Sequence, residues 1–195
     1  MRQAVKTLDF ETAAALRNLL QQPTPPEEFV TNPNLLSDRR QEALESLRLA
    51  TGYWPLARIE MYDVAHLAGS AATGAMTVAI NGQLTPQNYR HFTIRSGNDD
   101  VARLTEMLTR RLKTDWPKPD LIVLDGGLPQ LSLAHKERPC AVIALAKQEE
   151  IIYTSTSKIK LPRTHPGLQL LQRLRDEAHR FSRRLHHKHR SLIIK

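Results

Sequence analysis

The chain has 195 residues, enough to enclose one hydrophobic core, and its 41% hydrophobic content is typical of a globular protein rather than a disordered one. Its longest apolar run, residues 140–146, is too short to cross a bilayer, and the N-terminal residues lead into no apolar signal core. We therefore expect a cytoplasmic protein with no membrane partner, in which Cys140, the only cysteine, stays reduced.

Positive charge is concentrated toward the C-terminal end. Residues 163–195 contain nine Lys and Arg against two Asp and Glu, and so carry +7 of the net charge of +8. Such a segment suits a polyanion, above all nucleic acid, as its partner. The alternative is an ordinary solvated basic helix. A membrane surface is disfavoured because the segment has few aromatic residues to insert.

The first 34 residues are predicted to form a helical motif and a linker. Apolar residues recur at helical spacing in 1–21, which indicates a short helix or helical hairpin whose apolar face needs a partner. Residues 22–34 are rich in proline and predict a semi-rigid linker. The remainder, 35–195, is expected to form one folded domain.

This domain is predicted to begin with a helix at 35–49 and to continue as a sheet. Asn81-Gly82 is a strong hairpin signal, so the first three strands are expected to form an antiparallel meander. Buried and alternating apolar runs place the strands at 58–66, 73–80, 89–94, 119–125 and 140–146.

Helices are predicted to alternate with strands in the second half of the domain. An apolar stripe over 100–112 indicates a helix that crosses over to the strand ending at Asp125. Residues 149–161 are expected to form a hairpin or an irregular excursion, and 165–190 a long helix. The predicted fold class is α/β, a mixed sheet with flanking helices.

Two apolar strands each end in an aspartate. Asp63 closes the run that starts at Ile59, and Asp125 closes the run that starts at Leu121. The end of a strand presents side chains at the rim of a sheet, so neighbouring strands would bring the two carboxylates together. Paired carboxylates can hold a hard divalent cation. Each aspartate taken alone is more simply explained as the start of a turn.

Four polar residues share one face of the predicted last helix. Arg175, His179, Ser182 and His186 follow one another at spacings of four, three and four. A histidine in this position can contact a phosphate, a metal-bound water or a leaving oxygen. The spacing alone favours an ordinary surface histidine at position 179.

Five motifs follow one another along the chain. They are Arg58 to His66, Asp99-Asp100, Asp120 to Gly127, Ala146-Lys147, and Arg173 to Phe181 with its Asp-Glu-Ala-His-Arg-Phe block. Together they resemble the UvrC family, the nuclease subunit of the bacterial excinuclease. The resemblance implies a ribonuclease H-like fold, which agrees with the predicted order of three strands, a crossover helix, a strand and a closing helix.

The resemblance also implies an active site. Asp63 and Asp125 match the metal-binding aspartates of the family, and His179 matches the histidine that completes the site. Asp100 matches a further acidic residue, although the helix dipole also favours an acid in a first turn. The implied reaction is hydrolysis of a DNA phosphodiester with Mg²⁺ or Mn²⁺ as cofactor. In this reaction His179 would orient or protonate near the phosphate, with an ordinary pKa of about 6.5.

Basic residues in and beside the last helix are the expected contacts for damaged double-stranded DNA. Such contacts to phosphates lose affinity steeply as salt rises. The expected set comprises Lys147, Arg175, Arg180, Arg183, Arg184, Lys188 and Arg190.

The N-terminal helix resembles the short UVR motif through which the family contacts UvrB. Residues 8–17 read Leu-Asp-Phe-Glu-Thr-Ala-Ala-Ala-Leu-Arg, and Asn18 stands where Asp is usual. UvrB is therefore the second expected partner. The alternative is that this helix docks on the domain of its own chain. The expected contact residues are Leu8, Phe10, Ala14 and Arg17.

In the family, the ribonuclease H-like half makes the 5′ incision at a lesion and a GIY-YIG nuclease makes the 3′ incision. The chain contains no Gly-Ile-Tyr or Tyr-Ile-Gly pattern, so we expect a 5′-incising endonuclease that is a fragment or a reduced relative. Leu128-Pro129-Gln130 replace a usual Lys and Gly-Gln, which predicts weaker DNA affinity or a lower rate. Two alternatives stay open: a non-catalytic adaptor for UvrB and DNA, and a generic ribonuclease H-like nuclease that needs no helicase partner.

Overall fold

The computed structural model divides into two compact units, residues 1–38 and 39–195. The sheet and the predicted site residues Asp63, Asp125 and His179 belong to the second unit. The predicted helical motif at 1–21 and all but the last residue of the linker at 22–34 lie outside the described part of the chain, so both stay predictions. The described residues are 34–65, 72–94, 99–127, 129, 131, 140–147 and 149–193.

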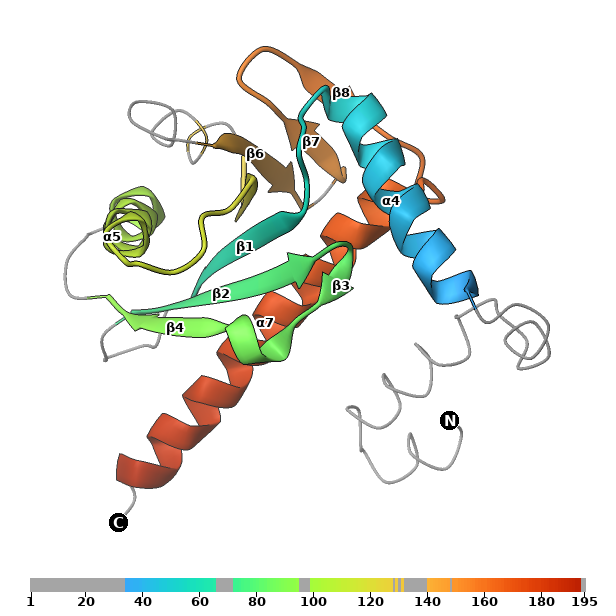
Figure 1. Ribbon diagram of the computed structural model, residues 1–195. Helices are drawn as coiled ribbons and strands as arrows, with labels where there is room; N and C mark the ends of the chain where they lie inside the picture. The colour runs from blue at the N-terminus through green and yellow to red at the C-terminus, as the bar shows by residue number, and fades with distance from the viewer. Residues whose placement is uncertain are drawn as a thin grey trace, which may run out of the picture. The chain divides into compact units, whose positions relative to one another are not determined.

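Helices surround a mixed eight-stranded sheet (Figure 1). The helices in the described part of the chain are α4 (Leu35–Thr51), the 3-10 helix η1 (Pro86–Asn88), α5 (Asp100–Leu112) and α7 (Pro166–Ile193). The strands are β1 (Arg58–Ala65), β2 (Thr73–Ile80), β3 (Gln83–Leu84), β4 (Arg90–Thr93), β5 (Leu121–Asp125), β6 (Ala141–Ala146), β7 (Ile151–Tyr153) and β8 (Lys158–Lys160).

The sheet has the order β3-β2-β1-β5-β6-β7-β8, and β4 also pairs with β2. Strands β1, β5 and β6 are parallel, whereas β2, β7 and β8 run antiparallel to their neighbours. Because α5 connects β4 to β5, the chain passes from the antiparallel part to the parallel part through one crossover helix. This arrangement confirms the predicted mixed sheet with flanking helices.

The predicted hairpin turn is present. Asn81 and Gly82 have φ of 49° and 76°, the left-handed values that a two-residue hairpin turn requires. The turn leads from β2 into the two-residue strand β3, which was not predicted. The predicted third strand is β4, and it pairs with the first half of β2, so the antiparallel meander is confirmed.

Each face of the sheet packs on a different helix. Side chains alternate along a strand, so Ile59 and Met61 of β1 face α7, where they join Leu171 and Leu174 in one apolar cluster. Tyr62, one position on, belongs to a second cluster on the α5 side. The two helices thus cover opposite faces of the sheet. Asp63, two positions after Met61, lies on the face of β1 that packs on α7.

Two glycines allow close approach between elements. A Cβ at Gly167, at the start of α7, would lie 2.8 Å from both the backbone N and the Cβ of Leu47 in α4. A Cβ at Gly74 in β2 would contact the end of the Met107 side chain in α5, which is flexible and can move. At Gly167 the obstacle includes backbone atoms, so only a residue without a side chain fits there without a shift of the helix.

A buried charged network ties α5 to β1. Glu60 is fully buried, and its carboxylate accepts hydrogen bonds from Nε of Arg58 at 2.8 Å and from the hydroxyl of Tyr62 at 2.6 Å. Nε and Nη2 of Arg111 donate to the same carboxylate at 3.0 and 2.8 Å. Since every charge in this network has a partner, the network can lie inside the core and fix α5 against the middle of β1.

Most predicted boundaries agree with the observed ones. The helix predicted at 100–112 is α5, and the long helix predicted at 165–190 is α7. The segment 149–161 forms the antiparallel hairpin of β7 and β8. Among the described residues, no helix combines the length and the apolar character that crossing a membrane requires.

Candidate metal centre

Strand register brings Asp63 and Asp125 together. Strands β1 and β5 are parallel neighbours, with Met61 opposite Val123 and Tyr62 opposite Leu124, so the next position in this register pairs the two aspartates. Met61 and Val123 lie in the cluster that packs on α7. Because side chains two positions apart point to the same face, both carboxylates lie on the α7 side.

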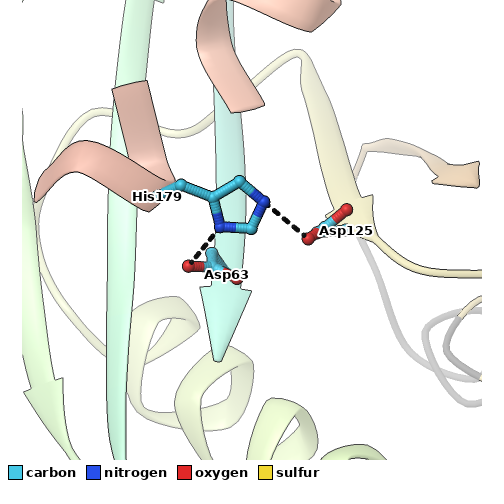
Figure 2. Close-up of side chains that lie close together, drawn as sticks. All are labelled: Asp63, Asp125 and His179. Atoms are coloured by element: carbon cyan, nitrogen blue, oxygen red, sulfur yellow. Dashed lines mark hydrogen bonds and ion pairs between the residues drawn. The ribbon is translucent and has the colours of Figure 1, made fainter. Parts of the chain in front are cut away.

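Helix α7 places His179 between the two carboxylates, as Figure 2 shows. Its Nδ1 atom lies 3.1 Å from Oδ2 of Asp63, and its Nε2 atom lies 3.3 Å from Oδ2 of Asp125. Leu174 and Ala178 are fully buried and hold this part of the helix on the sheet. The structure thus brings these three residues together, and their role as one active site stays a prediction.

The two carboxylates dominate the electrostatics of the imidazole. The carboxylate of Asp125 has the largest effect and that of Asp63 follows; together they raise the pKa of His179 from its usual value to about 9, although burial opposes them. The imidazole is therefore protonated at neutral pH when no cation is bound. This pKa differs from the ordinary value that was expected from the sequence, because two acids face the ring from opposite sides.

The donor atoms of this site fit a divalent cation. One ligand atom from each of Asp63, Asp125 and His179 can be chosen so that all three lie within 4.8 Å of one another. Nε2 of His179 is buried and lacks a hydrogen-bond partner among the described residues, because its contact with Asp125 has the distance of an ion pair but not hydrogen-bond geometry. Two carboxylates and an imidazole nitrogen left without a hydrogen bond form a suitable ligand set for such an ion.

Asp100 does not belong to this cluster of described residues. It lies in the first turn of α5, its side chain is 56% exposed, and it forms an ion pair with Arg103 at 3.3 Å. The N-cap of the helix is Asp99, which accepts a hydrogen bond from the amide of Ala102. A role of Asp100 in the reaction stays a prediction.

The residues predicted to bind DNA differ in accessibility. Lys147, Arg183 and Arg184 are exposed, and Arg180 is half exposed and paired with Glu177. The side chains of Lys188 and Arg190 lie outside the described part of the structure, as do Leu8, Phe10, Ala14 and Arg17 of the predicted UvrB contact. DNA contacts by these basic residues stay predictions.

Arg175 is largely buried rather than exposed. Its side chain is 9% exposed, and both of its Nη atoms donate to Glu150 at 2.9 Å. A contact of Arg175 with DNA likewise stays a prediction, but the observed partner of its guanidinium is a carboxylate of the same chain. Glu150 was not predicted from the sequence, because no local pattern marks two residues separated by 25 positions as neighbours.

Comparison with known proteins places the chain in a family. A family described as the UvrC RNAse H endonuclease domain matches residues 48–182. The UvrABC system protein C of Thermus thermophilus is 39% identical over 171 residues, which is 80% of this chain and 28% of that protein. The same protein of Chlorobium phaeobacteroides is 39% identical over 176 residues, 78% of this chain and 28% of that protein. The chain thus spans less than a third of these relatives.

Among solved structures, the chain is similar to endonuclease V of Ciona intestinalis in complex with a DNA containing an inosine. The two share 14% sequence identity and a TM-score of 0.39 over 64% of this chain and 59% of the other, a likeness too distant to bear on function. The family match runs from the end of α4 into α7 and includes Asp63, Asp125 and His179, the three residues that the structure brings together. The chain therefore belongs to the family of UvrC ribonuclease H endonuclease domains.

Proposed function

We propose that this chain is the nuclease that makes the 5′ incision at damaged DNA in nucleotide excision repair. The observation that carries the proposal is the cluster of Asp63, Asp125 and His179 in a member of this family. A decayed, non-catalytic relative would have no reason to keep two register-matched carboxylates and an imidazole within ligand distance of one another.

Asp63 and Asp125 would hold Mg²⁺ or Mn²⁺, with His179 as the third member of the site. When bound, the cation would activate water and neutralise charge on the reacting phosphate. Asp63 orients the ring of His179 through the contact with Nδ1, so that Nε2 faces the rim of the sheet beside Asp125. His179 can therefore hold or release a proton at a fixed position next to the phosphate.

DNA would be bound along the basic C-terminal half of α7. Arg183 and Arg184 are exposed and follow His179 on the same helix, so a backbone bound at the site can reach them. UvrB would be engaged by residues 1–21, and incision by the chain alone should be weak. Both partners are inferred from the family to which the chain belongs.

The experiment that tests this proposal is incision of an end-labelled duplex with one bulky adduct and a nick on its 3′ side. UvrA, UvrB and Mg²⁺ or Mn²⁺ are supplied, and wild type is compared with Asp125→Asn. The matched control is Asp115→Asn, an exposed aspartate after α5. The expected result is a 5′ cut by wild type and by the control, and none by Asp125→Asn.

The outcomes separate the competing functions. A wild type that binds UvrB and DNA but makes no cut would support the adaptor instead. A cut that does not need UvrA or UvrB would support a generic ribonuclease H-like nuclease. A 5′ cut that survives Asp125→Asn would rule out the site proposed above.

A further inference from the structure

A bidentate ion pair joins α7 to the turn that follows β6. Nη1 and Nη2 of Arg175 donate to the two carboxylate oxygens of Glu150, each at 2.9 Å. The two side chains are 9% and 13% exposed, so solvent screens this pair less than a surface pair. A bidentate contact between guanidinium and carboxylate fixes the orientation of the two groups as well as their distance.

Both partners lie close to the candidate metal centre. Arg175 precedes His179 by four residues on α7, which is about one helical turn. Glu150 follows β6, in which Leu145 is paired with Asp125 and its carbonyl accepts a hydrogen bond from the amide of Gly126 at 3.2 Å. His179 is therefore connected to Asp125 by a series of contacts: helix α7 links His179 to Arg175, the ion pair links Arg175 to Glu150, and β6 links Glu150 to Asp125.

Asp63 is held against α7 by different contacts. Strands β1 and β2 pack directly on the helix, and the hydroxyl of Thr77 donates to the carbonyl of Leu174 at 3.1 Å. The contact between Asp63 and His179 has hydrogen-bond geometry, whereas the contact between Asp125 and His179 does not. Asp63 is thus positioned by its own hydrogen bond to His179 and by the packing of β1 and β2. The distance between Asp125 and His179 depends instead on the contacts that hold β5 and β6 against α7.

The backbone of Glu150 also points to a defined role. Its φ is 54°, a left-handed conformation that glycine or asparagine adopts more readily than glutamate. A glutamate at this position is explained by the partner of its side chain rather than by the conformation of the turn.

We propose that Arg175 and Glu150 are positioning residues that set the separation between Asp125 and His179, and through it the affinity of the site for a divalent cation. The inference rests on the proposed function, because it takes the three-residue cluster as the cation site. It gives Arg175 a role other than the direct DNA contact predicted from the sequence, since both of its Nη atoms are engaged by Glu150.

Because Arg175 and Glu150 carry opposite charges, a positioning role of the pair can be distinguished from a direct effect of either charge on cation affinity. Through-space electrostatics alone predicts that removing the Glu150 carboxylate weakens cation binding and that removing the Arg175 guanidinium strengthens it. A positioning role predicts that either change weakens binding, because each breaks the same contact. Removal of a group that hydrogen-bonds directly to a metal ligand typically weakens metal affinity by roughly 10- to 100-fold, and this pair acts one contact further out, so a loss at the low end is expected.

The test is a titration of the full chain with Mn²⁺, followed by electron paramagnetic resonance of the free ion. Glu150→Gln and Arg175→Gln are each expected to weaken binding by roughly 10-fold. The exchanged pair, Glu150→Arg with Arg175→Glu, is expected to recover a large part of the loss. Glu149→Gln is the matched control, because this neighbouring glutamate is exposed and forms an exposed ion pair with Lys160 at 3.7 Å, and wild-type affinity is expected.

Hydrogen exchange of backbone amides in the metal-free protein gives a second measure of whether the ion pair holds Asp125 in place. The Gly126 amide, bonded to Leu145, is expected to exchange faster in Glu150→Gln than in Glu149→Gln. Unchanged Mn²⁺ affinity in both glutamine variants, or changes of opposite sign, would overturn the positioning role.

If wild type itself binds no Mn²⁺, the proposed function fails and amide exchange alone decides whether the pair fixes Asp125. Should Arg175→Gln not fold, Arg175→Lys, which keeps the charge but loses the bidentate contact, replaces it with the same expected loss.

Discussion

Nδ1 of His179 lies 3.1 Å from Oδ2 of Asp63, a residue that precedes it by 116 positions in the chain. With Asp125 on the other side of the ring, the imidazole bridges two carboxylates. In the absence of a cation, this arrangement makes a protonated His179 a counter-ion for two acids that would otherwise repel each other. The same two acids would be neutralised by a bound divalent cation.

The metal-free protein should therefore lose stability as the pH rises through about 9. The folded state raises the pKa of His179, so the stabilisation is fully present below the unfolded value of about 6.5 and disappears above about 9. The measurement is the free energy of unfolding against pH for wild type and His179→Gln in a chelator. The difference between the two curves should shrink across this window, and a difference that grows with pH would contradict the assignment.

Breaking the buried network at Glu60 should cost far more than breaking a surface pair. Arg111→Met would leave the fully buried carboxylate of Glu60 without its bidentate partner, at a cost of about 3–5 kcal/mol. Arg110→Met is the matched control, because the neighbouring arginine is 44% exposed and pairs with Glu106 on the surface. Chemical denaturation of both variants tests this, and equal losses would show that the network adds no stability beyond a surface pair.

Local patterns predicted the elements of this fold well, because each pattern acts over a few residues. The apolar stripe of α5 and the buried runs of β1 and β5 gave their boundaries to within a few residues. The position of each aspartate at the end of a strand also predicted that Asp63 and Asp125 would meet if their strands were neighbours, and the two strands are parallel neighbours. For His179, helical spacing alone favoured a surface residue, and only the resemblance to a family placed it in the site.

Long-range pairs could not be predicted in this way. Glu60 pairs with Arg111 across 51 residues, and Glu150 pairs with Arg175 across 25. Which charges meet depends on the angles at which helices cross the sheet, and no local pattern encodes these angles. One signal was present, because a glutamate in the middle of an apolar strand such as β1 requires a buried cation.

Gly167→Ala should destabilise the contact between α7 and α4. The new methyl group would lie 2.8 Å from the backbone N of Leu47, and a backbone atom cannot move aside without shifting the helix. We expect a loss of about 1–3 kcal/mol in the free energy of unfolding. Gly127→Ala is the matched control, because the one described atom that its methyl group would approach is Cδ of Pro129, at an ordinary contact distance of 3.8 Å. Similar values for the two variants would show that α4 can move to accommodate the methyl group.

Neutralising Arg183 and Arg184 should lower both the affinity for DNA and its dependence on salt. Each phosphate contact releases counterions from the duplex, so the loss of one contact should reduce the slope of log affinity against log salt by about 0.9. We expect Arg183→Gln and Arg184→Gln each to show this reduction in fluorescence anisotropy titrations with an undamaged duplex. Arg163→Gln, at an exposed position just before α7, is the control with matched charge and should keep the wild-type slope. If all three variants change the slope equally, DNA binding depends on net charge rather than on the part of α7 that follows His179.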